Sequence, residues 1–233
     1  MITALGKEVF SSLEEVADPR HTALVVIDVQ NDFCSPKGLF DRIGKNLDMM
    51  SPAVDRIAVL VEEARLAGVL PIFVQNQWLP DNRVVSGPFL RFMITKQGMD
   101  PSEGCCVSNT WGAEILENAG RRPNDIVVQK WRPSAFRGTN LDMVLRCNNI
   151  RSVVLTGVIT QGCVESTARD AMFHDYYTVV MEDCVATYSR DLHEASLKVM
   201  RSRFDVLPSG ELIEIWRGAR RANAPGSEQA ATQ

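Results

Sequence analysis

Five stretches of the chain are apolar at nearly every position, and a sixth, weaker stretch follows near the C-terminal end. Continuous apolar runs of this length are typical of strands that are buried on both faces of a parallel sheet. The predicted strands are residues 22–28, 70–74, 125–129, 152–156 and 177–181, with the weaker one at 204–207. The pattern therefore predicts five or six parallel strands.

Helical patterns lie between these runs. Residues 52–67 place apolar side chains at helical spacing and stop before Gly68, a residue type that favours a left-handed C-cap. Residues 139–142 (Thr-Asn-Leu-Asp) predict a capping box, and residues 163–175 predict another amphipathic helix. This alternation predicts an α/β fold, a three-layer doubly wound sheet of about six parallel strands with helices on both faces.

The pattern divides the chain into three parts. We expect an N-terminal segment at 1–21, a single domain at 22–218 and a flexible tail at 219–233. Within the domain, residues 77–111 interrupt the alternation with repeated Pro and Gly. A connection of this length predicts a lid over a site or an element between subunits, and the sequence leaves both open.

The composition of the chain argues against nucleic acid and membranes as partners of this domain. The 233 residues include 25 Lys and Arg against 29 Asp and Glu, a formal net charge of −4, with no basic run suited to nucleic acid or an anionic membrane. We therefore expect a small-molecule partner, no nucleic acid and no membrane. The first twenty residues lack the apolar core of a signal peptide, and no apolar run approaches the ~18 residues of a membrane span.

The six cysteines show neither the paired spacing of a zinc site nor the density of a disulfide-stapled domain. Reduced thiols are the expectation, which favours a cytoplasmic protein. All except Cys163 are interpreted as structural. The histidines, His21, His174 and His193, lie before the first strand or on predicted helices, where structural or surface roles are expected.

Reactive side chains follow three of the predicted strands. Asp28 ends the first strand, Lys130 follows 125–129, and Cys163 lies after a turn where a helix is expected to begin. A helix N-terminus favours the thiolate form of a cysteine. Each residue alone has a simpler interpretation, as a turn carboxylate, a solvated lysine or a buried core cysteine. Together they supply a base, a cation and a nucleophile at the edge where parallel sheets bind ligands.

Three separated motifs carry a resemblance to a known family. They are residues 26–33 (Val-Ile-Asp-Val-Gln-Asn-Asp-Phe), 128–130 (Val-Gln-Lys) with 134–136 (Ser-Ala-Phe), and 157–167, which contains Cys163. In these positions the chain resembles the isochorismatase-like cysteine hydrolases over about 22–215. The resemblance implies a six-stranded parallel sheet and an Asp-Lys-Cys triad.

Carried onto this chain, the family mechanism makes Asp28 the base for the Cys163 thiol, with Lys130 holding the carboxylate and favouring the thiolate. Cys163 then attacks a carbonyl carbon and forms a thioester that water hydrolyses. The resemblance also implies a cis peptide bond between Val158 and Ile159, with the N–H groups of Ile159 and Cys163 facing the developing oxyanion.

Two departures from relatives of this family narrow the chemistry. Nicotinamidase members carry an Asp-x-His-x-x-His cluster, but residues 75–81 read Gln-Asn-Gln-Trp-Leu-Pro-Asp here, so we expect no catalytic metal and no cofactor. Isochorismatases proper lack the cysteine that stands at Cys163. Its presence favours amide hydrolysis.

The substrate is expected to be a small amide. The residues around Asn76 and Cys163 resemble those of ureidoacrylate and other carbamoyl-amide hydrolases, which implies a carbamoyl or ureide substrate and release of ammonia. Asn76 and Trp78 are predicted contacts, with a turn Asn and a packed Trp as the alternative. Four further contacts are proposed with core packing or surface exposure as their alternative: Phe33, Trp131, Phe136 and Arg137.

Two other functions stay open at this point. One is isochorismate-type vinyl-ether hydrolysis that uses Asp28 with Cys163 as a bystander, and the other is a redox or ligand-binding module without hydrolysis. The family resemblance also implies a homo-oligomer, a dimer or tetramer. On the helix after Cys163, Arg169 and Glu165 lie one turn apart and are expected to pair.

Overall fold

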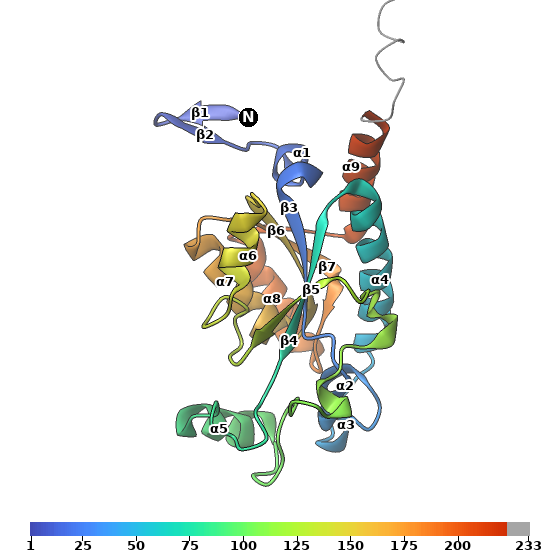
Figure 1. The fold of residues 1–233 in the computed structure, drawn as a ribbon, viewed down its shortest axis with the longest axis vertical. Helices are drawn as coiled ribbons and strands as arrows, with labels where there is room; N and C mark the ends of the chain where they lie inside the picture. The colour runs from blue at the N-terminus through green and yellow to red at the C-terminus, as the bar shows by residue number, and fades with distance from the viewer. Residues whose placement is uncertain (223–233) are drawn as a thin grey trace, which may run out of the picture.

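The structure is built around a parallel six-stranded sheet (Figure 1). A computed structural model describes residues 1–222, and all neighbouring strands of this sheet run parallel. In spatial order the strands are β5 (Ile126–Lys130), β4 (Leu70–Asn76), β3 (Thr22–Ile27), β6 (Ser152–Val158), β7 (Tyr177–Ala186) and β8 (Asp205–Leu207). All six predicted strands are confirmed, and β7 runs on to Ala186 rather than ending at residue 181.

Helices cover both faces of the sheet (Figure 1). On one face lie α4 (Met50–Ala67) and α9 (Ser209–Ala222), and on the other lie α6 (Leu141–Cys147), α7 (Glu165–Phe173) and α8 (Arg190–Arg201). Every residue of β3 and β6 is buried between the two layers, which explains why these runs are almost entirely apolar. The predicted three-layer, doubly wound α/β fold is confirmed.

The helix boundaries agree with the sequence in one case and correct it in another. Helix α4 ends at Ala67, and Gly68 takes the left-handed conformation of a C-cap with φ 85°. No capping box forms at the start of α6. The N–H of Leu141 does donate to Oγ1 of Thr139 at 3.1 Å, but the Asp142 carboxylate binds Arg146, one turn further along, instead of turning back.

The N-terminal segment contains structure that the sequence did not predict. Strands β1 (Ile2–Ala4) and β2 (Lys7–Val9) form an antiparallel hairpin that extends away from the domain (Figure 1), followed by α1 (Leu13–Val16) and the 3-10 turn η1 (Pro19–His21). The end of the segment is attached to the domain. Phe10 stacks on Tyr177 at 4.7 Å, and Nε1 of Trp216 donates to the carbonyl of Ala17 at 3.0 Å.

Helix α9 extends past residue 218, the predicted end of the domain. Residues 219–222 are therefore helical rather than part of a loose tail, and Arg220 and Arg221 lie in the last turn, where positive charge stabilises a helix end. The rest of the predicted tail, 223–233, lies outside the described residues. Among residues 1–222, no helix is long and apolar enough to cross a membrane.

Short helices gather beyond the carboxyl ends of the strands (Figure 1). Two of them, α2 and α3, follow β3, and four more belong to the long connection between β4 and β5. Their bounds are α2 (Asn31–Cys34), α3 (Leu39–Arg42), α5 (Gly87–Phe92), the π-helical η2 (Met93–Gln97), and the 3-10 turns η3 (Trp111–Ala113) and η4 (Glu117–Ala119). These elements surround the edge of the sheet where the reactive side chains lie.

Candidate active site

Three side chains meet at the carboxyl edge of the sheet, and we call them the Asp-Lys-Cys cluster. Nζ of Lys130 lies 2.8 Å from Oδ2 of Asp28 and 3.3 Å from Sγ of Cys163. The same ammonium donates a hydrogen bond to the carbonyl of Arg132 at 3.0 Å. The side chains of Lys130 and Asp28 are 1% and 0% exposed, so bulk water does not screen their ion pair.

The topology explains why these residues meet. The chain fills one side of the sheet with β4 and β5 and then crosses to β6, so its direction reverses beside β3, where sheets of this kind bind ligands. Asp28 follows β3 and Cys163 follows β6. Lys130 ends β5, two strands and about 10 Å away from β3, and its long side chain spans the end of β4.

Two backbone positions adapt the strand ends to this arrangement. Asp28 has φ 54°, an uncommon left-handed conformation that clusters at functional sites, while its N–H still donates to the carbonyl of Val74 at 2.9 Å. Gly157, with φ 111°, is paired with Ile27 of β3. A Cβ at Gly157 would lie 2.0 Å from the carbonyl oxygen of Ile27, so the close approach of the two strands requires glycine.

Cys163 lies in a π-helical turn, η5 (Thr160–Val164), and α7 begins only at Glu165. The expectation that Cys163 opens an α-helix is therefore corrected. Turns of this type are frequent at functional sites. His193 of α8 supports the turn through a contact of 2.9 Å between its Nδ1 and Oγ1 of Thr160, and burial lowers the pKa of this histidine, which keeps the ring neutral.

Burial sets the protonation states of the cluster. Burial raises the pKa of Asp28, although the charge of Lys130 opposes this shift. Burial acts to lower the pKa of Lys130, but Asp28 and Cys163 outweigh it, so the pKa is raised and the ammonium stays charged. Burial and the Asp28 charge raise the pKa of Cys163 to about 12. A protonated thiol therefore lies beside a carboxylate that is able to accept its proton.

A pocket encloses the Asp-Lys-Cys cluster. It has about 560 Å³ of space, part of it open to solvent, and all three residues of the cluster line it. Three of the six predicted substrate contacts, Phe33, Asn76 and Trp78, also line it. The N–H and carbonyl of Asn76 are both bonded to the side chain of Gln30, so the amide side chain of Asn76 is the part that is available to the pocket.

The proposed oxyanion residues belong to the same wall. Val158 and Ile159 line the pocket next to Cys163, and the peptide bond between Val158 and Ile159 is cis, as the family resemblance implied. The role of the N–H groups of Ile159 and Cys163 as donors to the oxyanion stays a prediction.

The other three predicted contacts are absent from the pocket lining. Arg137 is exposed, Trp131 is half-buried elsewhere, and Phe136 is buried in the core, where it stacks on His174 at 4.9 Å. The chain turns away from the pocket after Lys130 because the N–H of Ala135 donates to Oγ1 of Thr167, which draws this segment onto α7. Pro133 is the residue of this segment that reaches the pocket.

Residues 22–211 match the family model for the isochorismatase domain. The chain belongs to the isochorismatase family. The match covers β3, β5 and β6, the three strands whose carboxyl ends lead to Asp28, Lys130 and Cys163.

Several solved structures of other proteins are similar over most of this chain. A family protein from Burkholderia thailandensis is 29% identical, with 85% of this chain and 96% of that chain covered and a TM-score of 0.71. An N-carbamoylsarcosine amidase from Thermoplasma acidophilum is 28% identical, with 81% and 96% covered and a TM-score of 0.61. A cysteine hydrolase from Pseudomonas syringae pv. phaseolicola, 24% identical with 86% and 94% covered, shows the shared fold with a TM-score of 0.74.

In this isochorismatase-family chain, the long connection 77–111 supplies a wall of the pocket. Phe89 and Phe92 of α5 and Met93 and Gln97 of η2 line it. Sequence reasoning proposed a lid here but named none of these residues. A signal was present, because Phe89, Phe92 and Met93 follow the spacing of one helix face within a Pro- and Gly-rich segment. Both interpretations of this connection, as a lid and as an element between subunits, stay predictions.

The segment after Asp28 also has a role that sequence reasoning missed. Nε2 of Gln30 donates to the carbonyls of Asn76 at 2.9 Å and Ala113 at 2.7 Å, and Oε1 accepts from the N–H of Asn76 at 2.8 Å. Nδ2 of Asn31 donates to the carbonyl of Trp111 at 2.8 Å. These amides hold the end of β4 and the η3 turn in place, and thereby position the pocket walls.

The remaining polar residues considered from the sequence lie away from the pocket lining. Arg169 pairs with Glu165 at 2.7 Å, as predicted. His21 stacks on Phe10 at 4.7 Å. Within residues 1–222, a single group of side chains combines donors and spacing suited to a metal ion, and it consists of Asp32, Cys105 and Cys106 rather than any histidine.

Proposed function

We propose that this isochorismatase-family chain is a metal-independent cysteine amidohydrolase. It cleaves the C–N bond of a small carbamoyl or ureide-type amide through a thioester and releases ammonia. The observation that carries this proposal is the Asp-Lys-Cys cluster, in which the Asp28 carboxylate and the Cys163 thiol both lie within 3.3 Å of the Lys130 ammonium at the pocket. The structural similarity to an N-carbamoylsarcosine amidase supports a carbamoyl substrate.

The first half of the reaction forms the acyl-enzyme. Asp28 takes the proton of the Cys163 thiol while the sulfur bonds to the carbonyl carbon of the amide, and the carbonyl electron pair moves onto oxygen. The N–H groups of Ile159 and Cys163 are the proposed donors to this oxyanion. When the oxygen lone pair returns, the C–N bond breaks, the nitrogen takes the proton from Asp28, and ammonia leaves.

The second half restores the enzyme. Asp28, again a carboxylate, takes a proton from water as its oxygen attacks the thioester carbon. Collapse of the tetrahedral intermediate breaks the C–S bond, and the Cys163 sulfur regains the proton from Asp28. Lys130 stays charged throughout and balances the charge of Asp28 in this buried site. The product is the acid that corresponds to the amide.

The pocket walls support an uncharged substrate. Among the described residues that line the pocket, Lys130 is the sole cation, and it is paired with Asp28. The other walls are largely aromatic, and the ring centroids of Trp78 and Phe89 lie 6.1 Å apart. Asn76 offers both a donor and an acceptor to a urea-like group, and a planar group packs well against an aromatic face. We therefore propose a neutral amide without a carboxylate.

The test is an ammonia-release screen over ureides, biuret-like compounds, carbamoyl amino acids, nicotinamide and maleamate. Cys163→Ala should abolish turnover with nearly unchanged thermal unfolding, and the exposed Cys147→Ala is the matched control. Mass spectrometry of the wild type quenched during turnover should find the acyl group on the peptide that contains Cys163. Turnover retained in Cys163→Ala would remove the proposal and favour hydrolysis by Asp28 alone.

The homo-oligomer that the family resemblance implies stays a proposal. The segments α5 and η2 of the same chain line the pocket, and an element between subunits within residues 77–111 stays part of this proposal. Light scattering on the active protein determines whether a dimer or tetramer forms.

A further inference from the structure

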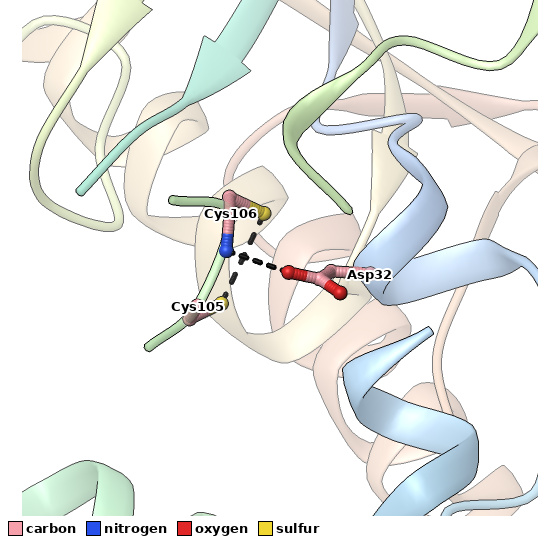
Figure 2. A group of neighbouring side chains, drawn as sticks. All are labelled: Asp32, Cys105 and Cys106. Carbon is pink, nitrogen blue, oxygen red and sulfur yellow. Dashed lines mark hydrogen bonds between the residues drawn. The ribbon is translucent and has the colours of Figure 1, made fainter. Parts of the chain in front are cut away.

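Two adjacent cysteines face a buried carboxylate beside the pocket (Figure 2). Sγ of Cys105 lies 3.9 Å from Sγ of Cys106, and one carboxylate oxygen of Asp32 lies within 4.8 Å of both sulfurs. All three residues are buried, with Cys105 and Cys106 only 1% and 0% exposed. The cluster brings together the loop after η2 and helix α2, which are more than seventy residues apart in the chain.

The carboxylate of Asp32 is held in a fixed orientation. Oδ2 accepts a hydrogen bond from the N–H of Cys106 at 2.7 Å (Figure 2), and Oδ1 accepts from the N–H of Leu39 at 3.0 Å. A Cβ at Gly112 would lie about 2.4 Å from Oδ1, so the η3 turn packs directly on this group. A donor group fixed in this way loses little conformational freedom when it binds a ligand.

The spacing of the sulfurs fits a shared cation. Two thiolates on one tetrahedral zinc ion, each with a bond of about 2.3 Å, lie about 3.8 Å apart. The Cys105 and Cys106 sulfurs are 3.9 Å apart, close to this value and far longer than the ~2.05 Å between bonded sulfurs. Thiolate sulfurs select soft cations of the zinc group over magnesium or calcium.

The charges around the cluster also suit a divalent cation. Nη1 of Arg42 lies 4.0 Å from Oδ1 of Asp32 and offsets its charge. A divalent ion that displaces the protons of both thiols leaves the net charge of the buried cluster unchanged.

We propose that Cys105, Cys106 and Asp32 form a binding site for one soft divalent cation of the zinc group. The ion M²⁺ displaces one proton from each thiol and bonds to two thiolate sulfurs and a carboxylate oxygen. Cys105 also lines the pocket, which provides the route by which the ion reaches the site. The site takes no part in the hydrolysis proposed for Cys163.

Occupancy would stabilise one wall of the pocket. The N–H of Trp78 donates to the carbonyl of Cys106 at 3.1 Å, and the N–H of Ser108 donates to the carbonyl of Trp78 at 2.8 Å. An ion bound to Cys106 therefore ties this wall to α2 through Asp32. The three ligands come together only in the folded chain, so the ion binds the folded state and not the unfolded one. It should therefore raise the melting temperature in proportion to the logarithm of its concentration.

The test uses Cd²⁺ with reduced, chelator-treated full-length protein that carries Cys163→Ala, because the Cys163 thiol lines the same pocket and is itself a competing cadmium ligand. Calorimetry should show one Cd²⁺ per chain, with the ultraviolet charge-transfer absorbance of two cadmium–thiolate bonds and displacement by Zn²⁺. Cys105→Ser and Cys106→Ser should each weaken binding at least tenfold and halve or abolish the absorbance. Cys106→Ala serves as the second variant if the serine form is unstable.

Matched controls are Cys34→Ser and Cys184→Ser, which change buried cysteines outside the cluster. Both should keep the stoichiometry and the absorbance, and circular dichroism should show that all variants are folded. The site is overturned if saturable binding is absent with Cd²⁺ in tenfold excess over protein. It is equally overturned if folded Cys105→Ser and Cys106→Ser variants bind as the parent does, or if Cys34→Ser removes the absorbance.

Discussion

The ammonium of Lys130 and the carboxylate of Asp28 form an ion pair of 2.8 Å with almost no exposed surface. Removing one partner of such a pair leaves the other charge buried and unpaired, at a cost of about 3–5 kcal/mol, whereas removing both is often neutral. Lys130→Met should therefore lower the free energy of unfolding by about 3 kcal/mol and abolish ammonia release.

A double variant separates the two effects of Lys130. Asp28→Asn with Lys130→Met should recover most of the stability, as measured by urea unfolding, while activity stays lost. Equal stability of the wild type and Lys130→Met would show that the pair is not shielded as the structure indicates.

The pH dependence of hydrolysis should show a plateau. Because burial raises the pKa of Asp28, kcat/KM should rise with pH as this carboxyl loses its proton, at a pH above the ordinary carboxyl range. It should then stay level through pH 9, because burial holds the Cys163 thiol protonated up to a pKa of about 12. A free-thiolate mechanism would give a rise of about tenfold per pH unit that ends near the ordinary thiol pKa of about 8.5. Initial rates from pH 4 to 9 decide between the two.

The same thiol should make stability depend on pH. Above pH ~8.5 the unfolded thiol loses its proton while the folded one, with a pKa of about 12, keeps it. The folded state then binds more protons, so stability falls as pH rises through this window. Cys163→Ala removes this contribution and should gain about 1 kcal/mol per pH unit relative to the wild type between pH 9 and 10.

Urea unfolding of both proteins at pH 8, 9 and 10 measures this difference, because contributions from the other thiols cancel. A difference that does not change with pH would mean that the Cys163 thiol is not shielded in the folded state.

Gln30 should support both stability and substrate binding. Gln30→Leu leaves the N–H and carbonyl of Asn76 without their buried partner, while the carbonyl of Ala113 keeps the bond from Nε2 of Gln75, so the free energy of unfolding should fall by about 2 kcal/mol. KM should rise because the end of β4 is no longer fixed. The exposed Gln129→Leu is the matched control and should change neither value. Wild-type KM and stability in Gln30→Leu would exclude the positioning role.

The substrate contacts can be separated by a pair of variants. Asn76→Ala keeps the backbone bonds to Gln30 but removes the amide that faces the pocket, so KM should rise at least tenfold with a stability change of about 1 kcal/mol or less. Arg137→Ala changes an exposed residue outside the pocket lining and should leave KM unchanged. A rise in KM for Arg137→Ala alone would restore the anion clamp expected from the sequence.

The sequence predicted the sheet well because burial on both faces leaves a strong local signal. All residues of β3 and β6 are buried, and both strands are visible as apolar runs. The β1–β2 hairpin was missed because its strands have three residues each and are nearly all exposed, so neither burial nor alternation marks them. Residues 219–222 resemble a linker in sequence because their side chains are small or basic, although the basic residues favour the end of α9.

The candidate site was predictable where residues follow strand ends and not where they come from loops. Asp28, Lys130 and Cys163 could be placed together because parallel strands end at a common edge. Phe136 and Arg137 follow Lys130 closely in sequence but are drawn away by the bond between Ala135 and Thr167, a long-range contact without a local signal. The proximity of Asp32 to Cys105 and Cys106 depends on the same kind of contact.

The amides of Gln30 and Asn31 bind main-chain atoms of the segments that they hold. Main-chain atoms are common to every amino acid, so this support places no demand on the side chains of the walls it carries. Trp78, which lines the pocket just after the supported end of β4, can then be exchanged to admit a larger, smaller or more polar amide while the reacting groups keep their positions. The residues that select the substrate are therefore separate from the residues that react with it, so specificity can be redesigned at this wall without changing the reacting groups.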